Sequence, residues 1–256
     1  MSVIKDVSDY VYITCDGVGE GETMSIYTID DDYKIKKIWT NFYPNSIGLL
    51  YSTITDYLGF EVNEGEFKVM SLSSFGKPIY EKELKKMFDI NNFTINMDYF
   101  EFHKSPSKSF SKKLCEVFGE PYLNISEETN FNKYADIASS TQLILEHTMK
   151  NLIQKAIHLS GRRKIVLTGG VALNCKMIHS LSKQSIFEEM IVPPSPGDSG
   201  SAIGAANFAF LEKSKTKTLN FSNIFLGPKK NFINKKENKD NFFSKINVTN
   251  DFIIDA

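Results

Sequence analysis

Residues 164–174 read KIVLTGGVALN, in which a short apolar run is followed at once by two glycines. The run Lys164–Thr168 predicts a buried strand that ends at Gly169 and Gly170, and a helix is expected to begin near Val171. A strand that leads through a short loop into a helix pairs in parallel with the next strand, because a parallel connection needs a crossover. These residues therefore predict an α/β fold.

A second unit of the same kind follows. The run Met190–Val192 predicts another buried strand, the loop PPSPGDSG occupies residues 193–200, and the Ala-rich segment Ser201–Phe210 predicts a helix. The long periodic segment Tyr134–Leu159 precedes both units and predicts a helix that packs on the sheet. One face of this helix carries Ala138, Leu145, Thr148, Leu152 and Ala156.

Toward the N-terminus, three β-rich runs come first: Tyr10–Cys15, Thr23–Ile29 and Tyr33–Thr40. The tight turns between them, DGVGEG at 16–21 and DDD at 30–32, predict an antiparallel meander. We expect the meander and the later α/β units to form one lobe. The intervening residues predict helices at 47–58, Glu64–Leu72, Tyr80–Phe88 and Ser109–Phe118, and a strand at Phe93–Tyr99.

The composition, 41% apolar and 24% charged, is typical of a globular protein and excludes a collagen, a coiled coil and a disordered chain. Thirty basic and 31 acidic residues leave a net charge of −1, so neither nucleic acid nor a membrane is expected as a partner. Cys15, Cys115 and Cys175 are far apart, and the N-terminal residues lack an apolar signal segment. We therefore expect a cytoplasmic protein without disulfides.

Three loops share one design, in which a strand delivers glycines and a polar side chain to its carboxyl end. They are DGVGEG at residues 16–21, TGGVALN at 168–174 and SPGDSG at 195–200. Ligands of α/β sheets bind at this edge, and glycine lets a phosphate or a ribose approach the backbone. Each loop alone is compatible with a structural turn, but the three together favour a ligand-binding cleft.

Two aspartates in these loops have two interpretations each. Asp198 precedes an Ala-rich helix, so it is either an N-cap or a carboxylate that binds a metal or bridges a phosphate. Asp16 is either the first residue of a hairpin turn or a member of the same site. If both belong to one site, we expect their carboxylates to lie within roughly 4–8 Å, the span that one cation can bridge.

The chain resembles a known family over residues 10–228. The segments that carry the resemblance are ITCDGVGEGETMSIY, NSIGLLYSTITDYLGF, EGEFKVMSLSSFGKPIY, YADIASSTQLILEHTMKNLI, KIVLTGGVALNCKMIHSL, PPSPGDSGSAIGAA and NIFLGP. They are similar to segments of the nodulation-protein-type O-carbamoyltransferases, which include enzymes that carbamoylate antibiotics. The resemblance implies an actin-like ATPase (ribonuclease-H-like) fold.

The resemblance also implies a reaction. In the intact enzymes a C-terminal domain makes carbamoyl-adenylate from carbamoyl phosphate and ATP. The actin-like domain binds this adenylate beside an iron-like divalent metal and transfers the carbamoyl group to a hydroxyl of a small molecule or sugar. By motif, the resemblance assigns the metal to Asp16 and Asp198, and the nucleotide to Glu66, Lys68, Gly169, Gly170 and Asn174.

The chain departs from the family pattern in two respects. Members carry an earlier segment with a His-x-x-x-His pair, whereas none of the four histidines here precedes Asp16 and no two have that spacing. Ser71 stands where the family has glycine after the Glu-x-Lys-x-Met segment. We expect residues 1–228 to form an incomplete actin-like domain, and residues 229–256 a polar tail that leads toward a missing domain.

These departures leave three interpretations open. The chain is one subunit of a split enzyme, completed by neighbouring gene products that supply the histidines and the adenylate-forming domain. Alternatively, it is a catalytically inactive nucleotide-binding remnant or regulatory module, or a plain truncation. In each case we expect the isolated chain to be inactive, because imidazole ligands supply much of the affinity for iron-like ions.

Overall fold

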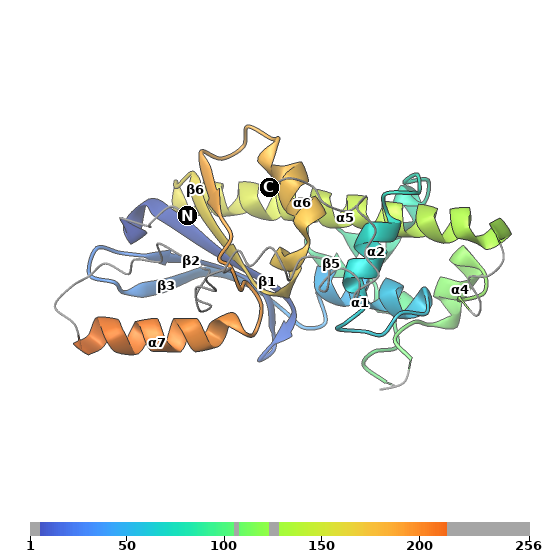
Figure 1. Cartoon of the computed structure of the whole chain (residues 1–256), viewed down its shortest axis with the longest axis horizontal. Helices are drawn as coiled ribbons and strands as arrows, with labels where there is room; N and C mark the ends of the chain where they lie inside the picture. The colour runs from blue at the N-terminus through green and yellow to red at the C-terminus, as the bar shows by residue number, and fades with distance from the viewer. Residues whose placement is uncertain (1–5, 105–107, 123–127, 214–256) are drawn as a thin grey trace, which may run out of the picture. The chain divides into compact units, whose positions relative to one another are not determined.

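The computed structural model of the chain describes residues 6–104, 108–122 and 128–213, which belong to one compact unit (Figure 1). The expected tail at residues 229–256 and the NIFLGP segment lie outside the described residues. The predicted domain boundary at residue 228 therefore stays a prediction.

The described unit is built on a five-stranded mixed sheet. The order across it is β3-β2-β1-β6-β7, with antiparallel pairing among β1, β2 and β3 and parallel pairing of β1 with β6 and of β6 with β7. This confirms the expected α/β class and the N-terminal meander. The bounds are β1 (Tyr10–Gly19), β2 (Glu22–Ile29), β3 (Ile35–Phe42), β6 (Lys164–Thr168) and β7 (Glu189–Ile191).

The first glycine loop differs from the expectation. Residues 16–19 continue strand β1, with an irregular register between Cys15 and Gly19, and only Glu20 and Gly21 form the turn. Both turn residues have positive φ, at 49° and 96°. The reason is that a two-residue turn of this kind closes a hairpin by itself, so the preceding residues remain in the sheet.

The helices follow the predicted apolar spacing to within a few residues. They include α1 (Ile47–Tyr57), α2 (Glu66–Leu72), α3 (Glu81–Met87), α4 (Lys112–Phe118), α5 (Glu128–Ser160), α6 (Cys175–Ser182) and α7 (Gly200–Lys213), with 3₁₀ turns η1 (Val7–Asp9), η2 (Met97–Tyr99) and η3 (Gly170–Leu173). Helix α5 extends from the sheet past α2, as Figure 1 shows.

The strand predicted at Phe93–Tyr99 is confirmed only at its two residues Thr94–Ile95. A two-residue strand, β5 (Thr94–Ile95), pairs with β4 (Phe88–Asp89), and the chain then turns into η2. The side chain of Asn96 accepts a hydrogen bond from the N–H of Asp98 and thereby caps the 3₁₀ turn. A local side-chain cap of this kind competes with extended structure, and alternating apolar residues do not reveal it.

Helix α1 begins where strand β1 reaches the site. Ser46 is its N-cap, with a hydroxyl that accepts from the N–H of Leu49 and donates to the carbonyl of Asp16, each at 3.1 Å. A Cβ added to Gly48 would lie 2.8 Å from the same carbonyl oxygen. Glycine at position 48 therefore allows the first turn of α1 to pack directly on the backbone of β1.

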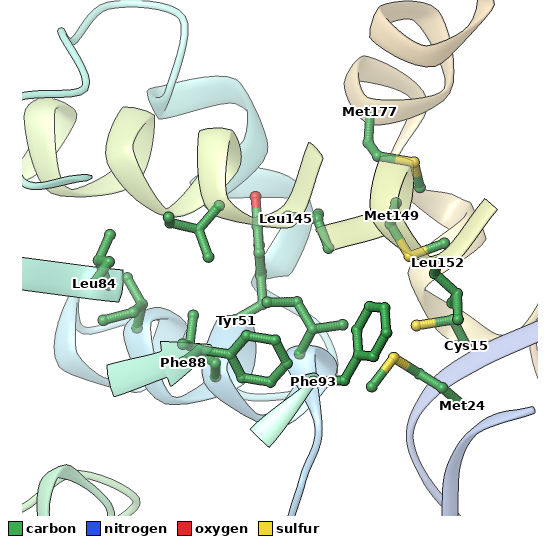
Figure 2. Close-up of a cluster of buried hydrophobic side chains, with 14 of the residues drawn as sticks. Cys15, Met24, Tyr51, Leu84, Phe88, Phe93, Leu145, Met149, Leu152 and Met177 are labelled. Atoms are coloured by element: carbon green, nitrogen blue, oxygen red, sulfur yellow. The ribbon is translucent and has the colours of Figure 1, made fainter. Parts of the chain in front are cut away.

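The core lies between the sheet, α1 and α5. Figure 2 shows Cys15 and Met24 of the sheet beside Met149 and Leu152 of α5, all of them buried. Burial raises the pKa of the Cys15 thiol, so this side chain stays neutral and packs as a small apolar group. The central strand and the long helix are thus joined by apolar contacts directly beneath the glycine loops.

Among the described residues, no helix is both long and apolar enough to cross a bilayer.

Leu152 tests the contact between α5 and the sheet. Its side chain is fully buried, and Leu152→Ala is expected to lower the free energy of unfolding by about 2–5 kcal/mol, because it leaves a cavity. Leu159→Ala is the matched control on the same helix, since Leu159 is 45% exposed, and its effect should stay within about 0.5 kcal/mol. Urea unfolding followed by circular dichroism measures both, and equal effects would contradict the packing described here.

Candidate functional site

The carboxylate of Asp16 joins the first and second glycine loops. Its Oδ1 accepts from the N–H of Gly17 at 2.7 Å, and its Oδ2 accepts from the N–H of Gly170 at 3.0 Å. A Cβ added to Gly170 would lie 2.8 Å from Oδ1. The absence of a side chain at position 170 is therefore what allows the carboxylate to reach this loop.

Gly169 brings the second and third loops together. It follows the last paired residues of β1 and β6, Thr14 and Thr168, and has φ of +93°. A Cβ added here would lie 2.1 Å from the carbonyl oxygen of Cys15. Its N–H donates to the carbonyl of Pro196 at 2.8 Å, so all three loops meet at the ends of β1 and β6.

The loops were expected to offer glycine N–H groups to an anion. Three of these groups are engaged within the protein, because those of Gly17 and Gly170 donate to Asp16 and that of Gly169 donates to Pro196. The glycines thus serve the close approach of the three loops to one another.

A cavity of about 280 Å³ opens beside Asp16, between α1, α2, α5 and the second loop. Four of the predicted site residues, Asp16, Glu66, Gly170 and Asn174, line it. Its lining is mostly apolar and includes Glu64, but no lysine, arginine or histidine among the described residues contributes to it. The cavity therefore suits an uncharged, partly apolar group with a few hydrogen-bonding atoms.

Asn174 has a structural role at this cavity. It is the N-cap of α6, and its Oδ1 accepts from the N–H of Met177 at 2.8 Å. Its amide also forms two hydrogen bonds with the amide of Gln142 from α5, at 2.9 and 3.0 Å. Two helices therefore hold Asn174 in place.

Glu66 and Lys68 of α2 point to different surroundings. The Oε1 of Glu66 accepts from the Ser52 hydroxyl at 2.7 Å and from the N–H of Asn63 at 3.0 Å, which fixes this carboxylate at the cavity wall. Lys68 is not a lining residue, and its ammonium group lies over the rings of Phe60 and Phe67, 5.6 and 5.9 Å from their centroids. Of the two, only Glu66 is brought to the cavity.

Helices α2 and α6, the latter following the second loop directly, are linked by a lysine. Lys176 of α6 donates to the hydroxyls of Ser73 and Ser74, at 2.8 and 3.2 Å. Burial lowers the pKa of its ammonium group. The lysine thus connects the end of α2 to the first turn of α6.

A second cavity, of about 480 Å³, shares Asp16 with the first. It is also lined by Gly169 and Asp198, which places both predicted metal residues at one cavity. Glu22 and Lys37 from the meander complete a polar wall, and the hydrogen bond from Lys37 lowers the pKa of the Glu22 carboxyl.

Asp198 lies two residues before the start of α7 and contacts the first turn of this helix. Its backbone carbonyl accepts from the N–H and the hydroxyl of Ser201, at 3.0 and 2.6 Å, in the first turn of α7. This contact is made by the backbone of Asp198 and not by its carboxylate.

The residues present do not by themselves form a metal centre. Four acidic residues, Asp16, Glu20, Glu22 and Asp198, line the second cavity, but no group of three or more His, Cys, Asp or Glu side chains among the described residues is arranged so that it could hold a metal ion. Both oxygens of Asp16 already accept a hydrogen bond from the backbone. A metal held here therefore needs ligands beyond the described residues.

Sequence reasoning missed Tyr51, Ser52 and Gln142. Gln142 had a detectable signal, because it lies four residues after Ala138 and three before Leu145, on the apolar face of the long helix. A glutamine on a buried helix face needs partners and so marks a polar contact. Tyr51 and Ser52 gave no comparable signal, since aromatic and hydroxyl residues are common in such helices.

Gly169 offers a test of how closely the loops approach. Gly169→Ala is expected to lower the free energy of unfolding by several kcal/mol, because the new Cβ would meet the Cys15 carbonyl and alanine is strained at positive φ. Gly21→Ala is the matched control, since Gly21 has φ of +96° but nothing within 4 Å, and only the strain of about 1 kcal/mol should remain. Thermal unfolding compares the two, and similar losses would show that the close approach has no energetic weight.

Comparison with known proteins identifies relatives of the chain. Residues 7–207 match the family described as carbamoyltransferase N-terminus. The chain is 35% identical over 203 residues to the uncharacterized protein sll1178 of Synechocystis sp., covering 77% of this chain and 32% of that protein. It is 27% identical over 198 residues to the nodulation protein NolNO of Sinorhizobium fredii, covering 76% and 27%. The chain thus spans about a third of the length of these relatives.

Among solved structures, the chain is similar to the activator of the 2-hydroxyisocaproyl-CoA dehydratase from Clostridium difficile with bound ADPNP. The TM-score is 0.45 at 17% identity, covering 82% of this chain and 62% of that one. The second is a ParM filament from Clostridium botulinum, with a TM-score of 0.30 at 14% identity and coverage of 79% and 46%.

The family match extends across the sheet, both cavities and all three glycine loops. The chain therefore belongs to the carbamoyltransferase N-terminus family.

Proposed function

We propose that the chain is the nucleotide-binding part of an O-carbamoyltransferase and that the cavity beside Asp16 receives the nucleoside of ATP or carbamoyl-adenylate. The observation that carries the proposal is the meeting of three loops at the Asp16 carboxylate, next to a cavity of about 280 Å³. That cavity has an apolar lining with a few fixed polar groups, which suits a base and a ribose. Membership of the family supports the same assignment.

The phosphate of the nucleotide would lie toward the second cavity, at Asp16 and Asp198. The carboxylates that line this cavity would repel a phosphate, so the phosphate would approach only with a divalent cation between them. Such a cation would neutralise phosphate charge and polarise the carbamoyl oxygen. Since the described residues offer an incomplete ligand set, we propose that a histidine-bearing segment elsewhere supplies the rest.

The reaction proposed is carbamoyl transfer to a hydroxyl. The acceptor oxygen attacks the carbamoyl carbon, a new carbon–oxygen bond forms, and the bond from that carbon to the phosphate oxygen of AMP breaks. AMP leaves with the electron pair, and the hydroxyl proton passes to solvent or a base. The chain's contribution would be to hold the adenosine part while the acceptor, a small molecule or sugar, approaches through the wider cavity.

A second candidate function is a nucleotide-binding regulatory module without chemistry. The observation that favours it is that no group of three or more metal-ligating side chains occurs among the described residues. The two candidates share the nucleotide site and differ in whether a partner completes the metal site.

Nucleotide binding is the first test. The 256-residue chain is expected to bind ATP in a calorimetric titration, and Gly170→Ala is expected to weaken binding about tenfold or more, because the new Cβ would displace the Asp16 carboxylate. Gly204→Ala in α7 is the matched control, since Gly204 has nothing within 4 Å, and it should bind like the wild type. Absence of ATP binding by the wild type would contradict both candidate functions.

Activity separates the two candidates. Supplied with carbamoyl-adenylate, iron(II) and a hydroxyl acceptor, the isolated chain is expected to give no carbamoylated product by mass spectrometry, because carboxylates without imidazole ligands bind such ions weakly. Adding a neighbouring gene product that carries the histidine segment should restore metal-dependent product. Product from the chain alone would refute the need for a partner, and no product with the partner would favour the regulatory module.

A further inference from the structure

A buried amide pair lies behind the nucleoside cavity. Gln142 of α5 is 2% exposed and forms reciprocal hydrogen bonds with Asn174, while both Tyr51 and Asn174 line the cavity. Gln142 itself is not a lining residue. It therefore acts on the cavity only through these two neighbours.

The backbone of α6 decides how the amide of Asn174 is oriented. The N–H of Met177 can only donate, so the atom that it meets at 2.8 Å must be the carbonyl oxygen Oδ1. The nitrogen Nδ2 of Asn174 then faces Gln142. The hydrogen bond of the helix cap thus decides which atom of the Asn174 amide is the oxygen and which is the nitrogen.

The orientation of Gln142 follows from that of Asn174. Its Nε2 must face Oδ1 of Asn174, at 3.0 Å, and its Oε1 must face Nδ2, at 2.9 Å. The second N–H of Nε2 donates to Oε1 of Glu146 at 2.9 Å. All hydrogen-bonding capacity of the Gln142 nitrogen is therefore used.

The hydroxyl proton of Tyr51 is fixed in turn. Tyr51 lies 3.1 Å from Oε1 of Gln142, which can only accept, so the hydroxyl must donate to it. Figure 2 shows this hydroxyl directed toward α5. Its oxygen accepts one long hydrogen bond, of 3.5 Å, from Nδ2 of Asn174, and its second lone pair stays available as an acceptor. Toward a ligand, Tyr51 is thus an acceptor and not a donor.

We propose that Gln142 is a positioning residue that presents the Tyr51 hydroxyl to the cavity as a hydrogen-bond acceptor. The cavity then selects a ligand with a donor at this point, which in a purine nucleotide favours a 6-amino over a 6-oxo group. The inference rests on the proposed nucleotide site and adds a rule of specificity to it.

Paired titrations with ATP and ITP test the proposal, because the two purines differ at this substituent. The wild-type chain is expected to bind ATP about fivefold more tightly than ITP, the value of one hydrogen bond. In Gln142→Met the Tyr51 hydroxyl is free to rotate and can donate to the 6-oxo group. The ATP-to-ITP preference should then fall to about twofold or less.

Matched variants separate specificity from stability. Gln154→Met is the same substitution at an exposed position of α5 and should keep the full preference for ATP. Tyr51→Phe should lose the preference for ATP over ITP. Adding Gln142→Met to Tyr51→Phe should change the preference no further. Thermal unfolding of each variant reports whether it folds. If Gln142 had a purely structural role, Gln142→Met would weaken the binding of ATP and of ITP equally.

The outcomes are distinguishable. If the wild type binds neither nucleotide, the proposed nucleotide site fails and this inference fails with it. Suppose instead that the wild type binds ATP and that either Gln142→Met or Tyr51→Phe keeps the full preference for ATP over ITP. The role assigned to Gln142 is then wrong, while the nucleotide site stands.

Discussion

The whole site depends on one close backbone approach, that of Gly169 to the carbonyl of Cys15. Because no side chain separates β1 from the end of β6, the N–H of Gly170 comes within reach of Asp16 and that of Gly169 within reach of Pro196. Two cavities then open around one carboxylate. Two glycines and one aspartate thus connect the meander, the loop after β6 and the loop that precedes α7.

The hydrogen bonds of the loop N–H groups change how the glycine pattern is interpreted. Glycines after a strand are commonly associated with phosphate binding by free N–H groups. Here the N–H groups of Gly17, Gly169 and Gly170 are engaged by the protein, and the glycines allow packing. Under the proposed function, ligand contacts would be made by side chains that other residues hold in place, such as Glu66 by Ser52 and Asn174 by Gln142.

The α/β class, the meander and most helices could be predicted from sequence, because apolar spacing and glycines mark the ends of these elements directly. Segment 93–99 could not, since the Asn96 side chain replaces strand pairing by a local turn. Asp16, Gly169, Gly170 and Asn174 were found by their strand-end positions. Tyr51 and Ser52 were not, because their role depends on partners that lie far away in the sequence. No local pattern reveals such partners. Lys68 has the expected position on α2 but lies over aromatic rings instead of at the cavity.

The pairing of β1 with β6 also bears on the order of folding. β1 pairs with its hairpin partner β2 across a two-residue turn, whereas Asp16 and Gly170 are 154 residues apart. Closing so long a loop costs entropy that local contacts do not repay, so the hairpin can form long before the site does. The residues that would meet a ligand are therefore assembled by the slowest pairing in the sheet, and a ligand bound there would hold the ends of β1 and β6 together.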